Sequence, residues 1–177
     1  MADNNVSAHL APGETTLGSR IPLTALGQEV PYPHKLTASG DLLSGRGGGA
    51  RVVLNDSGST LLPGRGIRWK DGYYQTRIGG YAGAGEPADG FIDHMLPAAG
   101  VADDYACLVV TKRGTPIYGW TDGANALAKG DYLKTAAAGQ VTKDTATPSS
   151  NGKAGSCEDT TIAATADLRF WMEFQPH

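Results

Sequence analysis

The pattern of apolar and polar residues along the chain predicts short β-strands separated by turns. The clearest strand is at residues 105–111, which are apolar throughout except for Thr111 at the end. A run this short and this apolar is typical of a strand buried on both faces of a sheet. Residues 166–174 alternate instead: Leu168, Phe170, Met172 and Phe174 share one face, and Arg169, Trp171 and Glu173 share the other. This alternation predicts a final strand with one face in the core.

Turn residues divide the middle of the chain into further strands. Asn55-Asp-Ser-Gly58 predicts a hairpin between residues 51–54 and 59–62, because Asn and Asp bond to nearby backbone and Gly allows positive φ. Asp71-Gly72 predicts a second hairpin between residues 67–69 and 73–78, with Trp69, Tyr73 and Tyr74 on a half-buried sheet face.

Further along the chain, Lys112-Arg-Gly114 predicts a turn back into a strand at 115–120, where Pro116 suits a strand start or a sheet edge. Residues 91–96 fit either a short strand or one helical turn, and periodicity does not decide between them. Residues 143–159 are rich in Thr, Ser, Asn, Gly and Lys, which predicts an exposed loop.

Residues 1–39 differ from the rest of the chain. They are polar, show no sustained periodicity and are punctuated by prolines, which favour extended or turn backbone. We therefore expect an extended N-terminal arm at 1–39 and a β-body at 40–177. An arm of this kind gains order by lying on another chain. The candidate residues for contact with that other chain are Pro12, Pro22, Pro31, Tyr32, Pro33, His34 and, from the glycine-rich loop, Arg46.

Composition supports an all-β body. The 177 residues include 25 glycines and 10 prolines, and only 19% are charged. Glycine and proline both disfavour helix interiors, so many turns and few long helices are expected. The chain is long enough to bury a core of its own. The expected fold is therefore a small β-barrel or β-sandwich.

Charge and hydropathy exclude several partners. A net charge of −3 and a pI near 5.7 argue against a general nucleic-acid binder. Arg46, Arg51, Arg65 and Arg68 could form a local basic strip, but scattered solubilising charges explain them more simply. No apolar stretch approaches the ~20 residues of a membrane span. The first residues lack the features of a signal peptide, so folding in a cytoplasm is expected.

Candidate chemistry along the chain is sparse. Cys107 lies in an apolar run and Cys157 beside acidic residues, so free, unreactive thiols are favoured and a disulfide between them is the alternative. The pairs Asp93-His94 and Asp103-Asp104 could serve acid/base work, but neither adjoins a recognisable nucleophile. The loop at 45–49 lacks the Lys-Ser/Thr of a phosphate loop, and the four widely separated histidines offer no zinc-ligand spacing. We expect no cofactor, no metal and no enzymatic activity.

One set of motifs carries a resemblance. The order of strands and turns resembles the small β-barrel module of tailed-bacteriophage capsid decoration, or cement, proteins. The similarity covers residues 79–174, about half of the chain, and the departures are the proline-punctuated start and the loop at 45–49. The segments that carry it are Ala98-Ala-Gly100, residues 109–118, 126–133 and 138–141, then Ala154-Gly-Ser-Cys-Glu158, residues 163–166 and 168–174.

The resemblance implies a trimer on the outside of a phage head, where it clamps neighbouring major capsid subunits. The partners would be the major capsid protein and further copies of the chain, and the location would be the virion, after assembly in the host cytoplasm. The main alternative is a glycan- or receptor-binding β-domain of a fibre or tail, with Trp69, Tyr73, Tyr74 and Trp120 as a stacking platform. An enzyme of unknown reaction is a third and weaker alternative.

Overall fold

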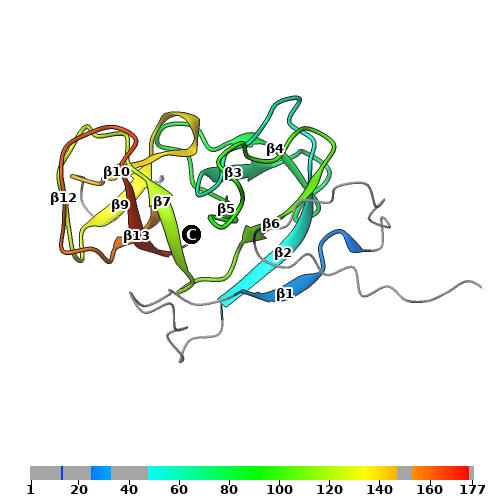
Figure 1. Cartoon of the computed structure of the whole chain (residues 1–177), viewed down its shortest axis with the longest axis horizontal. Helices are drawn as coiled ribbons and strands as arrows, with labels where there is room; N and C mark the ends of the chain where they lie inside the picture. The colour runs from blue at the N-terminus through cyan, green and yellow to red at the C-terminus, as the bar shows by residue number, and fades with distance from the viewer. Residues whose placement is uncertain (1–12, 14–24, 33–47, 147–152, 176–177) are drawn as a thin grey trace, which may run out of the picture.

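The protein is all-β in the part of the chain that the structure describes (Figure 1). The structure is a computed structural model that describes residue 13 and residues 25–32, 48–146 and 153–175. These residues contain no α-helix, and a short 3₁₀ turn, η2 (Ala137–Gly139), precedes β10. The strands are β1 (Glu29–Tyr32), β2 (Gly48–Asn55), β3 (Gly66–Trp69), β4 (Arg77–Tyr81), β5 (Gly90–Ile92), β6 (Ala106–Val110), β7 (Pro116–Trp120), β8 (Leu127–Ala128), β9 (Tyr132–Thr135), β10 (Val141–Lys143), β11 (Lys153–Cys157), β12 (Thr161–Ile162) and β13 (Arg169–Phe174).

The first sheet closes into a ring. Its order is β1-β2-β4-β3-β5-β6, and β2 also pairs with β6, so that β2 to β6 surround a small barrel interior while β1 lies outside the ring on β2. Apolar side chains fill this interior, among them Val53, Ile67, Ile78, Ile92 and Val109, all fully buried. A closed ring leaves few unpaired strand edges, which stabilises a sheet of short strands.

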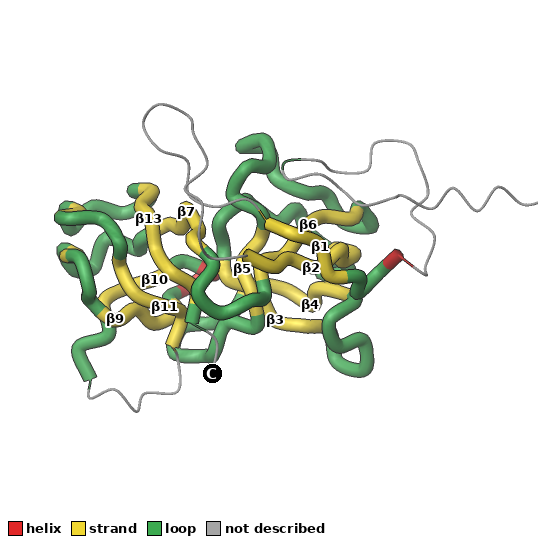
Figure 2. Tube along the Cα trace, turned by 90° about the horizontal axis from the view of Figure 1, so that it is seen from below, coloured by secondary structure: helices red, strands yellow, loops and turns green. Residues whose placement is uncertain are grey.

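The second sheet has the order β10-β9-β11-β13-β7, and a parallel bridge from Thr121 to Val141 links its two edges. The two sheets lie side by side (Figures 1 and 2). A second apolar core joins them: Phe91 and Leu108 come from the ring, and Phe170 and Phe174 from the second sheet. The rings of Phe91 and Phe174 meet edge to face with centroids 5.5 Å apart.

The strand predicted at 105–111 is confirmed as β6, and all five of its residues are buried. Its alternation explains why both faces are apolar. Cys107 and Val109 point into the ring, whereas Leu108 and Val110 belong to the core between the sheets. β6 is therefore one of the strands at which the two cores meet, together with β2 and β5.

The final strand is also confirmed. Phe170, Met172 and Phe174 of β13 are fully buried, and each burial contributes roughly 1.5 to 3 kcal/mol. Leu168 precedes the strand and is 36% exposed, so it does not share that face as expected. Pro116 begins β7 at the edge of the sheet, as predicted, and residues 90–92 form strand β5.

The hairpin expected between residues 51–54 and 59–62 is wrong. β2 pairs with β1, β4 and β6, and residues 59–62 contribute only an isolated bridge from Leu61 to Val101. The buried side chain of Asn55 gives the reason, because its Nδ2 donates to the carbonyls of both Ser59 and Val101. Asn55 makes the expected turn, but it directs the chain toward residue 101 instead of back along β2.

The second predicted hairpin is confirmed, with a later return strand. β3 pairs antiparallel with β4, which begins at Arg77 rather than at residue 73. Tyr73 and Tyr74 lie in the turn and are 47% and 69% exposed, so they are not on a half-buried sheet face. Trp69 is 9% exposed and belongs to the ring interior.

Two expectations about the second sheet are wrong. The turn at 112–114 does not fold β7 back onto β6, because β7 pairs with β13 in the other sheet. Part of the loop expected at 143–159 is strand β11, between β9 and β13. Its small residues fit close neighbours: a Cβ on Gly155 would lie 2.1 Å from the carbonyl oxygen of Glu173. The small residues of β11 gave this segment a composition typical of a loop, but they are small because neighbouring backbone lies so close.

Residues 29–32, expected in the N-terminal arm, form β1 instead. Val30 is 5% exposed and Tyr32 is 2% exposed, so this segment contributes to the core between the sheets. Pairing with β2 and burial of these side chains outweigh the preference of Pro31 for irregular backbone, which an edge strand tolerates. Most of the remaining residues of 1–39 lie outside the described part of the chain.

Candidate functional site

The contacts predicted for the arm are only partly covered by the structure. Five of them lie outside the described residues: Pro12, Pro22, Pro33, His34 and Arg46. Pro31 lies in β1. Tyr32 points into the molecule, where its hydroxyl donates to Asp93 Oδ1 at 2.5 Å. The Tyr32 side chain is therefore buried within its own chain and is not placed to contact another one.

Asp93 and His94 do come together with a third group, in what we call the Asp93 cluster. The carboxylate of Asp93 is fully buried and accepts hydrogen bonds from the Tyr32 hydroxyl, from the Met95 amide at 2.9 Å and from the Gly13 amide. The Tyr32 oxygen also lies 3.0 Å from His94 Nδ1. Because the hydroxyl proton goes to Asp93, His94 Nδ1 is the donor in this second bond.

Burial decides the charge state of this cluster. It lowers the pKa of His94 to about 4, with a further contribution from Arg169, while the Asp93 carboxylate opposes the shift. Burial and the Asp93 charge raise the pKa of Tyr32. A neutral imidazole and a neutral phenol thus surround one carboxylate. In the described residues no Ser, Cys or Lys side chain bonds to Asp93 or His94, and the geometry is that of a bonded structural cluster.

The other acidic candidates are also engaged in local structure. Asp103 accepts the amide of Gly58 at 2.8 Å and so joins two turns. Asp56 pairs with Lys70 at 2.7 Å and Arg77 at 2.9 Å, and hydrogen bonds from these two groups lower its pKa. Asp103 therefore stabilises the turn at Gly58. Asp56, in the turn that follows β2, fixes Arg77 at the start of β4.

The arginines considered for a basic strip are paired with carboxylates where the structure describes them. Arg51 lies 3.7 Å from Glu29, Arg65 lies 3.1 Å from Asp167, and Arg68 lies 3.0 Å from Asp89 and 3.7 Å from Glu86. Arg46 lies outside the described residues. These pairs neutralise much of the positive charge that a phosphate would contact.

Both cysteines are free and buried, as expected, so the alternative of a disulfide does not hold in this structure. Burial raises the pKa of both thiols. For Cys157, acidic neighbours beginning with Asp159 raise it further, although its bond to the Asp159 carbonyl opposes this. The thiol form is therefore favoured at both positions.

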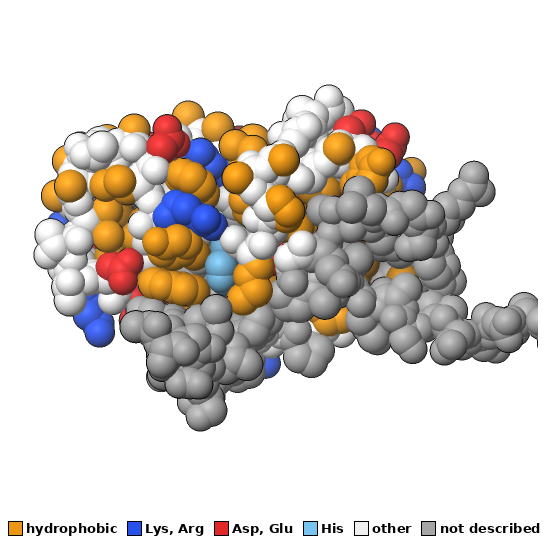
Figure 3. All heavy atoms as spheres, viewed as in Figure 1, with side chains coloured by type: hydrophobic (Ala, Val, Ile, Leu, Met, Phe, Trp, Pro, Cys, Tyr) orange, Lys and Arg blue, Asp and Glu red, His pale blue; other side chains and the backbone are white. Residues whose placement is uncertain are grey.

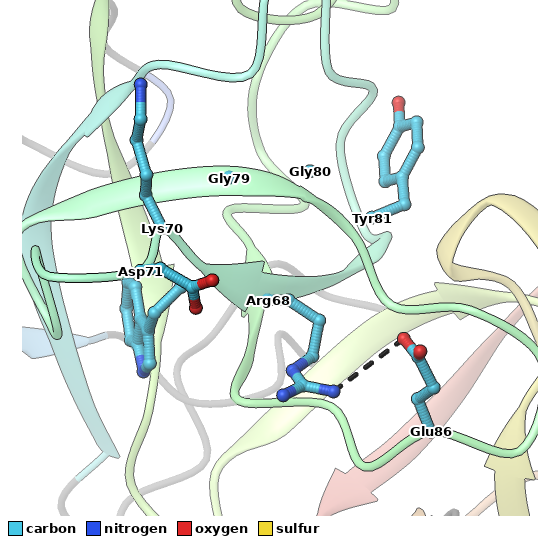
Figure 4. A pocket seen from close by; sticks show the side chains of 8 residues that line it. Arg68, Lys70, Asp71, Gly79, Gly80, Tyr81 and Glu86 are labelled. Atoms are coloured by element: carbon cyan, nitrogen blue, oxygen red, sulfur yellow. Dashed lines mark ion pairs between the residues drawn. The ribbon is translucent and has the colours of Figure 1, made fainter.

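A polar hollow of about 540 Å³ lies on the β3–β4 hairpin (Figure 4). Charged and phenolic side chains line it, and Arg68 and Glu86 face one another as an ion pair across one side. Trp69 also lines a smaller hollow of about 330 Å³, together with Tyr74 and Asp89. The rings of Trp69 and Tyr74 meet edge to face at 6.0 Å.

The stacking platform predicted from four aromatics is therefore not assembled as one surface. Trp69 and Tyr74 meet beside the hollow, and Tyr73 is covered by the Arg77 guanidinium at 4.5 Å from its ring centroid. Trp120 lies in the second sheet, at the end of β7. Its Nε1 donates to the carbonyl of Pro63 at 2.8 Å.

Trp120 belongs to a different cluster, on the outward face of β7 and β13. We define the aromatic–arginine strip as Tyr118, Trp120, Arg169, Trp171 and His94. The strand register creates it, because Trp120 pairs with Arg169 and Tyr118 pairs with Trp171. Figure 3 shows hydrophobic, basic and histidine side chains gathered on the face that it presents.

The side chains of the strip contact one another in sequence. The Arg169 guanidinium lies 4.7 Å from the Tyr118 ring centroid and 5.1 Å from that of Trp120. Tyr118 and Trp171 are 5.1 Å apart, and Trp171 and His94 are 5.2 Å apart. Each of these side chains is partly exposed. The result is a continuous and partly hydrated surface of rings around one guanidinium.

Arg169 is poorly satisfied in this surface. To the described residues it donates one hydrogen bond, from Nη2 to the carbonyl of His94 at 2.9 Å, and its buried Nε has no partner among them. Burial lowers the pKa of Arg169, and Tyr118 opposes the shift. No carboxylate of the described residues pairs with it. The Nε of the neighbouring Arg65, whose guanidinium lies 5.2 Å from the Trp120 ring, is likewise buried without a partner.

The sequence predicts which residues of each strand share a face, but it does not predict that the two strands of this strip lie side by side. The alternation in 166–174 places Arg169 and Trp171 on the outward face, and the same two-residue step relates Tyr118 to Trp120. The pairing of β7 with β13 brings these two rows together, and no local pattern encodes that pairing.

Comparisons with known proteins add no relative. No protein-family model matches this chain, and a search of curated proteins found no similar sequence. Among the described residues, none of the helical segments has the length and apolar character needed to cross a membrane. The same residues contain no group of three or more His, Cys, Asp or Glu side chains placed to hold a metal ion.

Proposed function

We propose that this protein is a structural component of a phage virion, which binds the outer surface of the capsid as a trimer and clamps neighbouring major capsid subunits. One observation carries the proposal. The residues that resemble decoration proteins, from 79 to 174, include β5, β6 and the whole second sheet, and the outward face of that sheet carries four members of the aromatic–arginine strip. A β-body with a preformed contact face suits a protein that acts by binding.

The mechanism we propose is mechanical. Two apolar cores that share β2, β5 and β6 make a body that resists deformation, and contacts repeated at each trimer add through multivalency. β1 and the Gly13 amide both hold the chain to the body through Asp93, so that residues before Gly13 can reach a neighbouring subunit from a defined point. The clamp needs no bond-making chemistry.

The test is binding to capsid shells. The full chain is mixed with expanded shells of the major capsid protein encoded in the same genome, and the bound fraction is measured by sedimentation. We expect saturable binding, and shells that carry the protein should withstand a higher temperature before they release DNA. A protein that stays in the supernatant at every concentration would contradict the proposal.

The proposed trimer is tested separately. Sedimentation velocity of the purified chain should show a species of three times the 18.4 kDa chain mass. A monomer at all concentrations, both free and when eluted from shells, would contradict trimer clamping while leaving capsid binding open.

The hollow on the β3–β4 hairpin favours a second candidate, a glycan- or receptor-binding domain of a fibre or tail. Trp69 lies there beside several charged groups and also lines the smaller hollow with Tyr74, and a sugar site combines aromatic with polar contacts. A glycan array probed with the purified protein separates the two candidates. Saturable sugar binding that Tyr74→Ala abolishes favours the glycan-binding domain, whereas shell binding without sugar binding favours decoration.

A further inference from the structure

The aromatic–arginine strip lacks a carboxylate for Arg169 in the part of the chain that the structure describes. Arg65 has the carboxylate of Asp167, but Arg169 has no carboxylate among the described residues and makes one hydrogen bond to a backbone carbonyl. A guanidinium offers five N–H donors in a planar fork that matches a carboxylate. The unmet donors of Arg169 define what a partner must bring.

The strip and its neighbour Arg65 also carry more positive than negative charge. Two guanidinium groups contact the Trp120 ring, and Asp167, whose side chain is 63% exposed, pairs with only one of them. Burial disfavours the charged form of Arg169, so an anion placed beside it gains more than it would beside a fully hydrated arginine. The strip is therefore complementary to a negatively charged partner.

The rings of the strip favour a protein segment over a sugar. A sugar stacks on an open ring face, but here Arg169 lies over Tyr118 and Trp120, and Trp171 already contacts both Tyr118 and His94. These side chains are partly exposed as residues, but their neighbours in the strip already occupy ring faces that a sugar would need. Side chains two residues apart on a strand are about 7 Å apart, and an extended peptide repeats with the same step.

We infer that the aromatic–arginine strip binds an extended acidic protein segment, with one carboxylate of that segment on Arg169. The inference deepens the proposed function, on which it rests only for the identity of the partner as a capsid protein. Aliphatic and ring-edge contacts with Trp120 and Trp171 would flank the carboxylate, because aromatic and Arg side chains dominate binding at protein interfaces.

The test uses peptides, so that it is independent of capsid shells. A fluorescein-labelled Glu-Thr-Glu-Thr-Glu-Thr peptide is titrated with the full chain by fluorescence anisotropy, beside its neutral Gln-Thr-Gln-Thr-Gln-Thr counterpart. Arg169→Gln should weaken binding of the acidic peptide by about 10- to 100-fold, the value of a charge-assisted hydrogen bond. The matched control is Arg113→Gln, which removes the same charge from the exposed turn between β6 and β7 and should change affinity less than about twofold.

Arg169→Lys keeps the test decisive if the Gln variant fails to fold. Lysine retains the charge without the planar fork, so its affinity should lie between those of the wild type and the Gln variant. Equal binding of the acidic and neutral peptides, or unchanged affinity in both Arg169 variants, would overturn the inference. Binding of 3′-sialyllactose but not of the acidic peptide would also overturn it, and would assign the strip to acidic sugars. Shell binding that survives either result would leave the proposed function standing.

Discussion

Two polar clusters, the Asp93 cluster and the aromatic–arginine strip, meet at His94 and differ in how completely their polar atoms are paired. In the first, one buried carboxylate accepts three hydrogen bonds, and the Tyr32 hydroxyl between Asp93 and His94 bonds to both. In the second, the partly exposed Arg169 lies against two rings, and no carboxylate of the described residues pairs with it. A paired cluster inside the molecule stabilises the fold, and an unpaired one at its surface is available to a partner.

The comparison predicts that stability depends on the first cluster and binding on the second. Four substitutions or conditions test this, and their effects on the free energy of unfolding should decrease in the order given.

Asp93→Ala should have the largest effect. It leaves the Tyr32 hydroxyl and the amides of Gly13 and Met95 without their acceptor, and loss of a buried charged partner costs about 3 to 5 kcal/mol. Urea denaturation measures the loss. Asp103→Ala is the matched control, because it removes one exposed turn contact and should cost less than about 1 kcal/mol. Equal losses in the two variants would remove the distinction between the clusters.

Acid should weaken the fold through His94. Its pKa is about 4 in the folded protein and about 6.5 when unfolded, so between these values the unfolded state binds more protons. Stability is therefore fully present above about pH 6.5 and falls as the pH is lowered toward 4, by up to about 3 kcal/mol.

Denaturation midpoints measured between pH 7 and pH 4 give the pH dependence, and His94→Gln should flatten it. Asp56 and Asp131 provide a separate contribution at lower pH. Lys70 and Arg77 lower the pKa of Asp56, and Lys143 lowers that of Asp131, so their stabilisation is lost mainly below about pH 4. A slope that is unchanged in His94→Gln would assign the acid sensitivity elsewhere.

Tyr32→Phe should cost about 2 kcal/mol, because it removes a hydrogen bond to a charged group and keeps the ring in the core. The exposed Tyr74 provides the control, since Tyr74→Phe should change the unfolding free energy by less than about 0.5 kcal/mol. Chemical denaturation compares the two. A Tyr32→Phe variant as stable as the wild type would mean that strand pairing and burial hold β1 without the hydroxyl bond.

Arg169→Gln should have the smallest effect on stability, about 1 kcal/mol, since it removes two partly exposed cation–π contacts and also a poorly satisfied charge. Thermal unfolding measures this. The same variant should have the largest effect on peptide binding. A large loss of stability would place Arg169 with the structural cluster.

The local features of the fold could be predicted from the sequence alone. The all-β class followed from glycine, proline and turn signals, the doubly buried β6 from its uninterrupted apolar run, and β13 from alternation. The hairpin of β3 and β4 followed from Asp71-Gly72. Each of these depends on neighbours within a few residues, where backbone preference and side-chain period act directly.

The tertiary structure alone decided which strands pair at long range. β1 and β11 had compositions typical of an arm and a loop, but pairing and burial in crowded positions made them strands. The same holds for the candidate site. Arg169 and Tyr118 are far apart in the chain, and they meet because β13 pairs with β7, an arrangement set by packing of whole sheets around shared cores.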